Sequence, residues 1–126
     1  MTIITADDEP LALEMLTDLV KTVKPEAEVF SFSRPQKIVE WIKTNKADVA
    51  FLDIRMRGMT GLELAEAIKA KDPETNIIFV TGYDEYALPA MSLHASGYVM
   101  KPVSEEKIRK ELEHLRFPVK DNSNVL

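Results

Sequence analysis

Five short apolar runs, separated by longer segments with helical spacing, constrain the fold of this chain more than any other feature. Each run has the length of a strand and is rich in Val, Ile, Phe or Tyr, which favour β-structure. A run as apolar as Ile77–Val80 suits an interior strand that is buried on both faces of a sheet. The five runs are Ile3–Ala6, Ala27–Phe32, Asp48–Leu52, Asn76–Thr81 and Gly97–Met100.

The segments between these runs place apolar side chains on one stripe of a helix, at spacings of three or four residues. Pro10 suits a first helical turn, and Ser104 is typical of a residue that caps a helix. A less regular helix is expected over Tyr83–Leu93, where Pro89 would kink or shorten it. The regular stripes are Leu11, Met15, Leu19 and Val23; Ile38 and Ile42; Leu62, Ala65 and Ile68; and Ile108, Leu112 and Leu115. Strands that alternate with helices predict parallel βαβ units, and hence an α/β fold with helices on both faces of the sheet.

The length and composition narrow the class of protein. A chain of 126 residues indicates a single domain, and the absence of cysteine excludes disulfides and thiolate metal sites. With 16 basic and 21 acidic residues, the chain lacks the basic footprint of direct nucleic-acid binding. Neither a signal peptide nor a membrane-spanning run is visible, so we expect a cytoplasmic protein that does not contact the membrane. Polar residues near the end predict a domain over 1–117 and a tail or linker start over 118–126.

Polar side chains follow four of the five apolar runs. Asp7 and Asp8 follow the first run, Asp53 the third and Lys101 the fifth, while Thr81 ends the fourth. Each could alone be a helix cap, an ordinary strand residue or a solvated charge. The carboxyl ends of parallel strands, however, meet at one edge of the sheet, where ligands bind. The four strand ends together therefore predict one site.

The side chains at this edge predict the chemistry of the site. Clustered carboxylates repel one another, and a divalent cation removes that repulsion. Oxygen ligands without His or Cys select a hard ion, Mg²⁺ before Zn²⁺. The Lys101 ammonium and the Thr81 hydroxyl suit a phosphoryl group, and Gly82 leaves room for it. No Gly-rich phosphate loop is present, so the phosphoryl group need not arrive on a nucleotide. Whether that group is covalently held stays open at this point.

Five motifs lie along the chain in a fixed order: Asp7–Pro10, Phe51–Met56, Gly58–Leu64, Thr81–Gly82 and Gly97–Val103. In their order and spacing they resemble the receiver (CheY-like) domains of two-component response regulators. The resemblance covers roughly residues 2 to 116. It implies a flavodoxin-like, doubly wound, five-stranded parallel sheet in order 2-1-3-4-5 with five helices.

The resemblance also implies residue roles. Asp53 would accept the phosphoryl group, because a strand end holds a carboxylate nucleophile rigidly. Mg²⁺, for which Mn²⁺ can substitute, would be held by Asp7, Asp8, Asp53 and the backbone carbonyl of Arg55. Lys101 would be the partner of the phosphoryl group.

Further roles concern the conformational switch. Thr81 would be the switch hydroxyl and Tyr98 the switch aromatic, and the Lys101–Pro102 peptide bond is expected to be cis. Phosphorylation would draw in the loop after Thr81, and Tyr98 would rotate toward the vacated space. We expect this change to alter the face formed by the helix in 83–93, the strand 97–100 and the helix after Ser104, and to promote homodimerisation there.

The resemblance implies a sensor histidine kinase as the partner that donates the phosphoryl group. The domain would not be an enzyme, since it would catalyse only its own phosphorylation and dephosphorylation. Residues 83–88 and 94–98 look like receivers attached to transcriptional output domains of the LytTR or winged-helix type. Contact with DNA would be made only through such an output domain.

The chain departs from the family pattern in the loop after Asp53. Arg57 stands where proline is common, and Thr60 stands where aspartate is common. Arg55 and Tyr83, two residues after the acceptor and the switch threonine, would border the path of the hydrolytic water. Both are large and unsuited to orienting that water, so we expect a long-lived phosphorylated state.

Two other functions share parts of this pattern. A phosphatase or phosphotransferase with an aspartyl nucleophile would use similar residues, but such enzymes usually enclose the substrate with a cap for which this chain has no room. A pseudo-receiver would have the fold without phosphorylation, and the intact set of Asp53, Thr81 and Lys101 argues against it.

Overall fold

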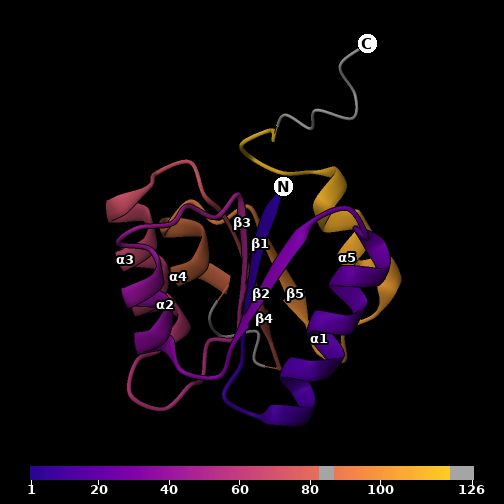
Figure 1. Cartoon of the computed structure of the whole chain (residues 1–126), viewed down its shortest axis with the longest axis horizontal. Coiled ribbons are helices and arrows are strands. Elements are labelled where there is room, and N and C mark those ends of the chain that lie inside the picture. Colours follow the sequence, from indigo (N-terminus) through magenta and orange to yellow (C-terminus); the bar gives the residue numbers. More distant parts are fainter. Residues whose placement is uncertain (83–86, 120–126) are drawn as a thin grey trace.

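The computed structural model describes residues 1–82 and 87–119. It contains a parallel five-stranded sheet in the order β2-β1-β3-β4-β5, with helices on both faces (Figure 1). The predicted α/β, flavodoxin-like fold and the strand order are therefore confirmed. The strands are β1 (Thr2–Ala6), β2 (Glu28–Phe32), β3 (Val49–Leu52), β4 (Asn76–Thr81) and β5 (Gly97–Met100).

In the part of the chain that the structure describes, five helices form the two outer layers (Figure 1). On one side of the sheet lie α2 (Pro35–Trp41), α3 (Gly61–Lys71) and α4 (Ala87–Ser92), and on the other lie α1 (Pro10–Val23) and α5 (Glu105–Glu113). Among the residues that the structure describes, none of the helices has the length and apolar character needed to cross a bilayer.

The core consists of two apolar layers, one on each face of the sheet. Neighbouring residues of a strand point to opposite faces, so Ile78 joins the layer beneath α1 and α5, and Phe79 joins the layer beneath α2 and α3. All residues of β3 and β4 are buried. Burial of the central strands on both faces explains why their sequences are continuous apolar runs.

The helix starts agree with the sequence signals. Pro10 is the first residue of α1, and the Ser104 side chain accepts a hydrogen bond from the Lys107 backbone at the start of α5. The segment expected to be helical over Tyr83–Leu93 is described from residue 87 on, and its described part, α4, ends at Ser92.

The expected apolar stripe of α1 is wrong at its beginning. Leu11 and Met15 are 82% and 57% exposed, while the buried face is formed by Leu16, Thr17 and Val20. Residues four apart are rotated by about 40° on a helix of 3.6 residues per turn, so a run of such steps winds around the helix. The stripe assigned to the last helix also extends too far, because α5 ends at Glu113 and Leu115 follows it.

Candidate functional site

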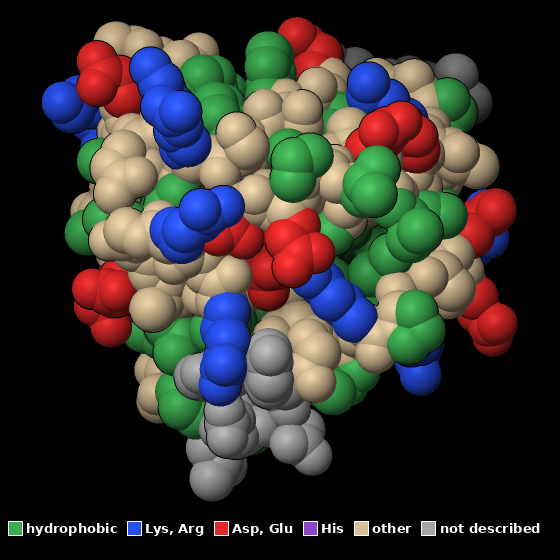
Figure 2. Space-filling model, turned by 90° about the horizontal axis from the view of Figure 1, so that it is seen from below, with side chains coloured by type: hydrophobic (Ala, Val, Ile, Leu, Met, Phe, Trp, Pro, Cys, Tyr) green, Lys and Arg blue, Asp and Glu red, His purple; other side chains and the backbone are tan. Residues whose placement is uncertain are grey.

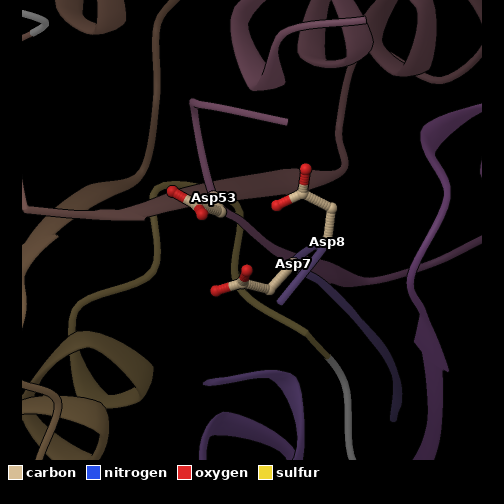
Figure 3. Close-up of side chains that lie close together, drawn as sticks. All are labelled: Asp7, Asp8 and Asp53. Atoms are coloured by element: carbon tan, nitrogen blue, oxygen red, sulfur yellow. The ribbon is translucent and has the colours of Figure 1, made fainter. Parts of the chain in front are cut away.

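Three carboxylates meet at the carboxyl edge of the sheet (Figure 3). Asp7 and Asp8 follow β1, and Asp53 follows β3. One ligand oxygen from each lies within 4.8 Å of the others. Asp7 and Asp53 are 1% and 7% exposed, so water screens their repulsion poorly.

Strand pairing brings these carboxylates together. β1 and β3 are neighbours in register, with Ala6 opposite Leu52. The backbone N–H of Asp53 donates to the carbonyl of Ala6 at 2.9 Å and so continues the ladder one residue past β3. Asp7 and Asp53 are the residues that follow this matched pair. Because of this register, two carboxylates distant in sequence become neighbours.

Lys101 is the cation of the site. Its Nζ donates to Oδ2 of Asp7 at 3.0 Å and to Oδ2 of Asp53 at 3.3 Å. The Lys101 backbone N–H donates to the carbonyl of Thr81 at 2.8 Å, which holds the chain after β5 beside the end of β4. The Lys101–Pro102 peptide bond is cis. One ammonium is therefore shared between two buried carboxylates.

The charges of the site shift two pKa values. Burial and, after it, the charge of Asp7 raise the pKa of the Asp53 carboxyl from its usual 3.8 to about 6, and Lys101 opposes part of this rise. Burial alone would lower the pKa of Lys101, but its hydrogen bond to Asp7 and the charges of both carboxylates raise it overall. The site thus holds more negative charge than its own cation compensates, which favours a further cation.

Asp8 has a different basic partner, one that the sequence did not indicate. Its Oδ2 accepts a hydrogen bond from the Arg57 backbone N–H at 3.0 Å, and the Arg57 Nε lies 3.5 Å from the same oxygen. The Arg57 side chain is 92% exposed. The sequence signal for this contact is that Arg57 stands where proline is common in the family.

The residues predicted to form the switch lie along the neighbouring strands. Thr81 ends β4 and is fully buried. Tyr98 lies in β5 and is half-buried, and its ring centroid is 6.5 Å from that of Phe79 in the core. Arg55 is exposed in the loop after Asp53, and Tyr83 lies outside the described residues.

The start of α3 lies close against the backbone at Asp53. Gly61 begins α3, and its backbone N–H donates to the Ile54 carbonyl at 2.7 Å. A Cβ atom at Gly61 would overlap the carbonyl oxygen of Asp53. Glycine is therefore required here, so that the helix start can lie against the backbone that carries Asp53.

The carboxylates fit a hard divalent cation. Oxygens bound to one Mg²⁺ at about 2.1 Å lie no more than about 4.2 Å apart. The oxygens of Asp7, Asp8 and Asp53, within 4.8 Å of one another, need only small side-chain rotations to reach that spacing. In Figure 2, which looks at this edge, acidic side chains gather at the centre with basic side chains beside them.

The fold and the site define the class of the protein. It is a flavodoxin-like domain whose functional centre is an acidic, lysine-containing cluster at the carboxyl edge of a parallel sheet. The family model of the response regulator receiver domain matches residues 3–113. The chain therefore belongs to the receiver domains of two-component response regulators.

Similar proteins include transcriptional regulators. The chain is 35% identical to the positive alginate biosynthesis regulatory protein of Pseudomonas aeruginosa, over 94% of this chain and 48% of that protein. It is 34% identical to the transcriptional regulatory protein LytR of Staphylococcus aureus, over 94% of this chain and 49% of that protein. The chain spans about half the length of the curated relatives that it matches.

Solved structures agree with this assignment. The response regulatory domain of mrkE from Klebsiella pneumoniae is 33% identical, with a TM-score of 0.83 over 91% of this chain and 94% of that chain. The response regulator TrrA of Thermotoga maritima, solved in complex with Mg²⁺-BeF, is 27% identical, with a TM-score of 0.77 over 89% of this chain and 96% of that chain.

Proposed function

We propose that Asp53 accepts a phosphoryl group from a partner histidine kinase in a Mg²⁺-dependent reaction, and that the resulting switch controls transcription through an output domain. The observation that carries this proposal is the shared contact of Lys101 with Asp7 and Asp53. It supports a site with excess negative charge, a place for a metal ion and a cation for a phosphoryl group.

The metal site of this proposal consists of Asp7, Asp8, Asp53 and the backbone carbonyl of Arg55. When bound, Mg²⁺ supplies positive charge that neutralises the carboxylates and the phosphoryl oxygens. TrrA, which is 27% identical to this chain and was solved in complex with Mg²⁺-BeF, supports this assignment by analogy. Mn²⁺, with similar preference for oxygen ligands, is expected to substitute.

The transfer step forms one bond and breaks one. A carboxylate oxygen of Asp53 attacks the phosphorus of a phosphohistidine, the new O–P bond forms, and the P–N bond breaks with its electron pair returning to the imidazole. Lys101 gives up one carboxylate partner and contacts the phosphoryl oxygens. The Thr81 hydroxyl, buried at the end of β4, donates to the same group and draws its loop toward Asp53.

The conformational change at Thr81 would then alter the protein surface through Tyr98 in β5. Tyr98 packs beside Phe79, and its rotation toward Thr81 changes the face formed by α4, β5 and α5. Met91 in α4 and Met100 in β5 are 70% and 36% exposed, which supports this face as an apolar contact surface. Phosphorylation is expected to promote a homodimer through this face. Because the domain is acidic, DNA would be bound by an output domain and not by this domain itself.

The test is phosphorylation in the absence of a kinase. Incubation with acetyl phosphate and Mg²⁺ should add one phosphoryl mass, and Asp53→Asn or chelation of the metal should abolish the addition. Asp18→Asn, which changes an exposed aspartate of α1, is the matched control and should be phosphorylated normally. A phosphoryl group that persists in Asp53→Asn would overturn the assignment.

The same experiment distinguishes two other functions. An aspartyl phosphatase would turn over a generic phosphate ester repeatedly, whereas this proposal expects negligible turnover. A pseudo-receiver would gain no phosphoryl mass in the parent protein.

A further inference from the structure

The segment that leaves α5 is fastened to the edge of the sheet opposite Asp53. After α5 the chain runs across the amino ends of the strands, close to the N-terminus (Figure 1). The sequence indicated only a compositional change near Phe117 and Pro118, and the predicted boundary between domain and tail falls within this segment. Contacts with three side chains of the domain hold residues 116 and 117 in place.

Asn76 makes the central contact. It is the first residue of β4 and is 1% exposed. Its Oδ1 accepts from the Phe117 N–H at 2.8 Å, and its Nδ2 donates to the Phe117 carbonyl at 2.7 Å and to the Asp48 carbonyl at 3.1 Å. A side-chain amide that bonds both polar groups of one residue acts as a neighbouring peptide unit would. Phe117 is therefore bound as an added strand residue would be.

Two further side chains hold the same segment. The Ser96 hydroxyl, just before β5, accepts a hydrogen bond from the Arg116 N–H at 2.9 Å. The Lys69 ammonium lies 4.8 Å from the centroid of the Phe117 ring, a cation–π distance. Lys69 is itself fixed, because its Nζ donates to the carbonyls of Pro73 at 3.0 Å and Thr75 at 3.2 Å.

We propose that Asn76, Ser96 and Lys69 form a docking site for the chain's own residues Arg116 and Phe117, and that these two residues keep their position when Asp53 is phosphorylated. The docking rests on contacts alone, and only its independence of phosphorylation rests on the proposed function. The chain would then leave the domain from a constant position at Phe117.

The position of Asn76 in the fold is the reason why we expect the exit segment not to respond to phosphorylation. Asn76 and Thr81 are the two ends of β4, so about 16 Å of strand separates Asn76 from the Thr81 hydroxyl. Every residue of β4 is buried between two apolar layers, which makes it one of the least deformable elements of the domain. We therefore expect a conformational change at the carboxyl edge to alter the surface formed by α4, β5 and α5 and to leave the exit segment in place.

Amide hydrogen exchange of the full chain tests the docking. We expect Asn76→Ala to accelerate exchange at the Arg116 and Phe117 amides by about tenfold or more, because both hydrogen bonds that hold Phe117 are lost, while β3 amides stay protected. Asn45→Ala is the matched control, since Asn45 is exposed and its side chain donates to the Trp41 carbonyl and to the Thr44 hydroxyl, both close to it in sequence. Unchanged exchange at both amides in Asn76→Ala would overturn the docking site.

A second variant covers the case in which Asn76→Ala unfolds the sheet. Ser96→Ala removes the acceptor of the Arg116 N–H without touching β4, so exchange at Arg116 should rise severalfold while the β3 amides keep their protection. An unchanged Arg116 amide in this variant would count against the docking site as well.

The independence of the exit from phosphorylation has its own measurement. Protein treated with acetyl phosphate and Mg²⁺, and shown by mass to carry the phosphoryl group, should exchange the Arg116 and Phe117 amides within about twofold of the untreated protein. A tenfold acceleration would show instead that phosphorylation releases the segment. Asp53→Asn, which removes the charge of Asp53 without phosphorylation, should likewise leave both amides protected. Failure of acetyl phosphate to modify the parent would contradict the proposed function and leave the docking results standing.

Discussion

The Nζ atom of Lys101 lies 3.3 Å from Oδ2 of Asp53, a residue 48 positions earlier in the chain. The same ammonium contacts Asp7 at 3.0 Å. One cation is thus divided between two carboxylates, and it is itself only 31% exposed. In the proposed phosphoryl transfer, this contact would have to rearrange.

The raised pKa of Asp53 predicts how stability depends on pH. Folding raises this pKa from 3.8 to about 6, so between these values the folded state binds more protons than the unfolded state. The free energy of unfolding contributed by Asp53 therefore falls as pH rises through this window. In metal-free buffer, Asp53→Asn should be more stable than the parent at about pH 7, by roughly 3 kcal/mol at most, and the difference should shrink toward about pH 4.

Urea denaturation at both pH values measures this difference, with Asp18→Asn as the control at an exposed position. A stability gain of equal size at both pH values would show that ionisation of Asp53 is not its cause.

Arg57 is expected to compete with the metal for Asp8. Its Nε lies 3.5 Å from Asp8 Oδ2, and its side chain is 92% exposed, so the ion pair is weak. Arg57→Gln keeps the backbone hydrogen bond and removes the charge, and it should raise Mg²⁺ affinity about twofold to fivefold at low salt. Calorimetric titration with Mg²⁺ measures the change. Arg109→Gln, which breaks an exposed ion pair with Glu105, is the control; equal affinities in the two variants would argue against competition.

Lys101 and Thr81 should act on the phosphoryl group and not on the metal. Lys101→Ala and Thr81→Ala are expected to retain Mg²⁺ affinity within a few-fold, because neither side chain is a metal ligand in the proposed site. Lys101→Ala should slow phosphorylation by acetyl phosphate about 100-fold, as loss of a charge-stabilising donor does elsewhere. A large loss of Mg²⁺ binding in either variant would mean that the metal position is misassigned.

The phosphorylated state should be long-lived. Arg55 is exposed in the loop after Asp53, and Tyr83, outside the described residues, follows the switch threonine by two positions. Neither side chain is an acid or amide suited to orienting the attacking water. The double variant Arg55→Asn, Tyr83→Ala should lose its phosphoryl group faster than the parent, as followed by mass over time. Equal rates of dephosphorylation in the two proteins would show that these side chains do not restrict access of the hydrolytic water.

Phosphorylation should produce a dimer through the face of α4, β5 and α5. Met91 is 70% exposed on this face, and Met91→Lys should keep the phosphorylated protein monomeric, because a charge would be buried in the contact. Sedimentation before and after acetyl phosphate treatment measures the change. Leu11→Lys, at a residue of α1 that is 82% exposed and lies outside the elements of this face, should leave the dimer intact. A parent protein that stays monomeric when phosphorylated would contradict this expectation.

The fold class and the composition of the site could be predicted from the sequence. The bounds of β4 and β5 agree with the apolar runs Asn76–Thr81 and Gly97–Met100, because burial on both faces leaves a continuous apolar signature. Asp7, Asp53 and Lys101 could be assigned to one edge because the carboxyl ends of parallel strands meet there. These features follow from local periodicity and from a general rule of topology.

Three features could not be predicted from the sequence, because they depend on long-range packing: the buried face of α1, the contacts of Arg57 and the place where the chain leaves the domain. Leu11 and Met15 are as apolar as Leu16, and packing against the sheet alone determines which of them is covered. Asn76 binds the backbone of Phe117, 41 positions away, through groups that every residue possesses. A contact of this kind leaves no periodic pattern in the sequence, because it depends on the folded path of the chain and not on the spacing of side chains along it.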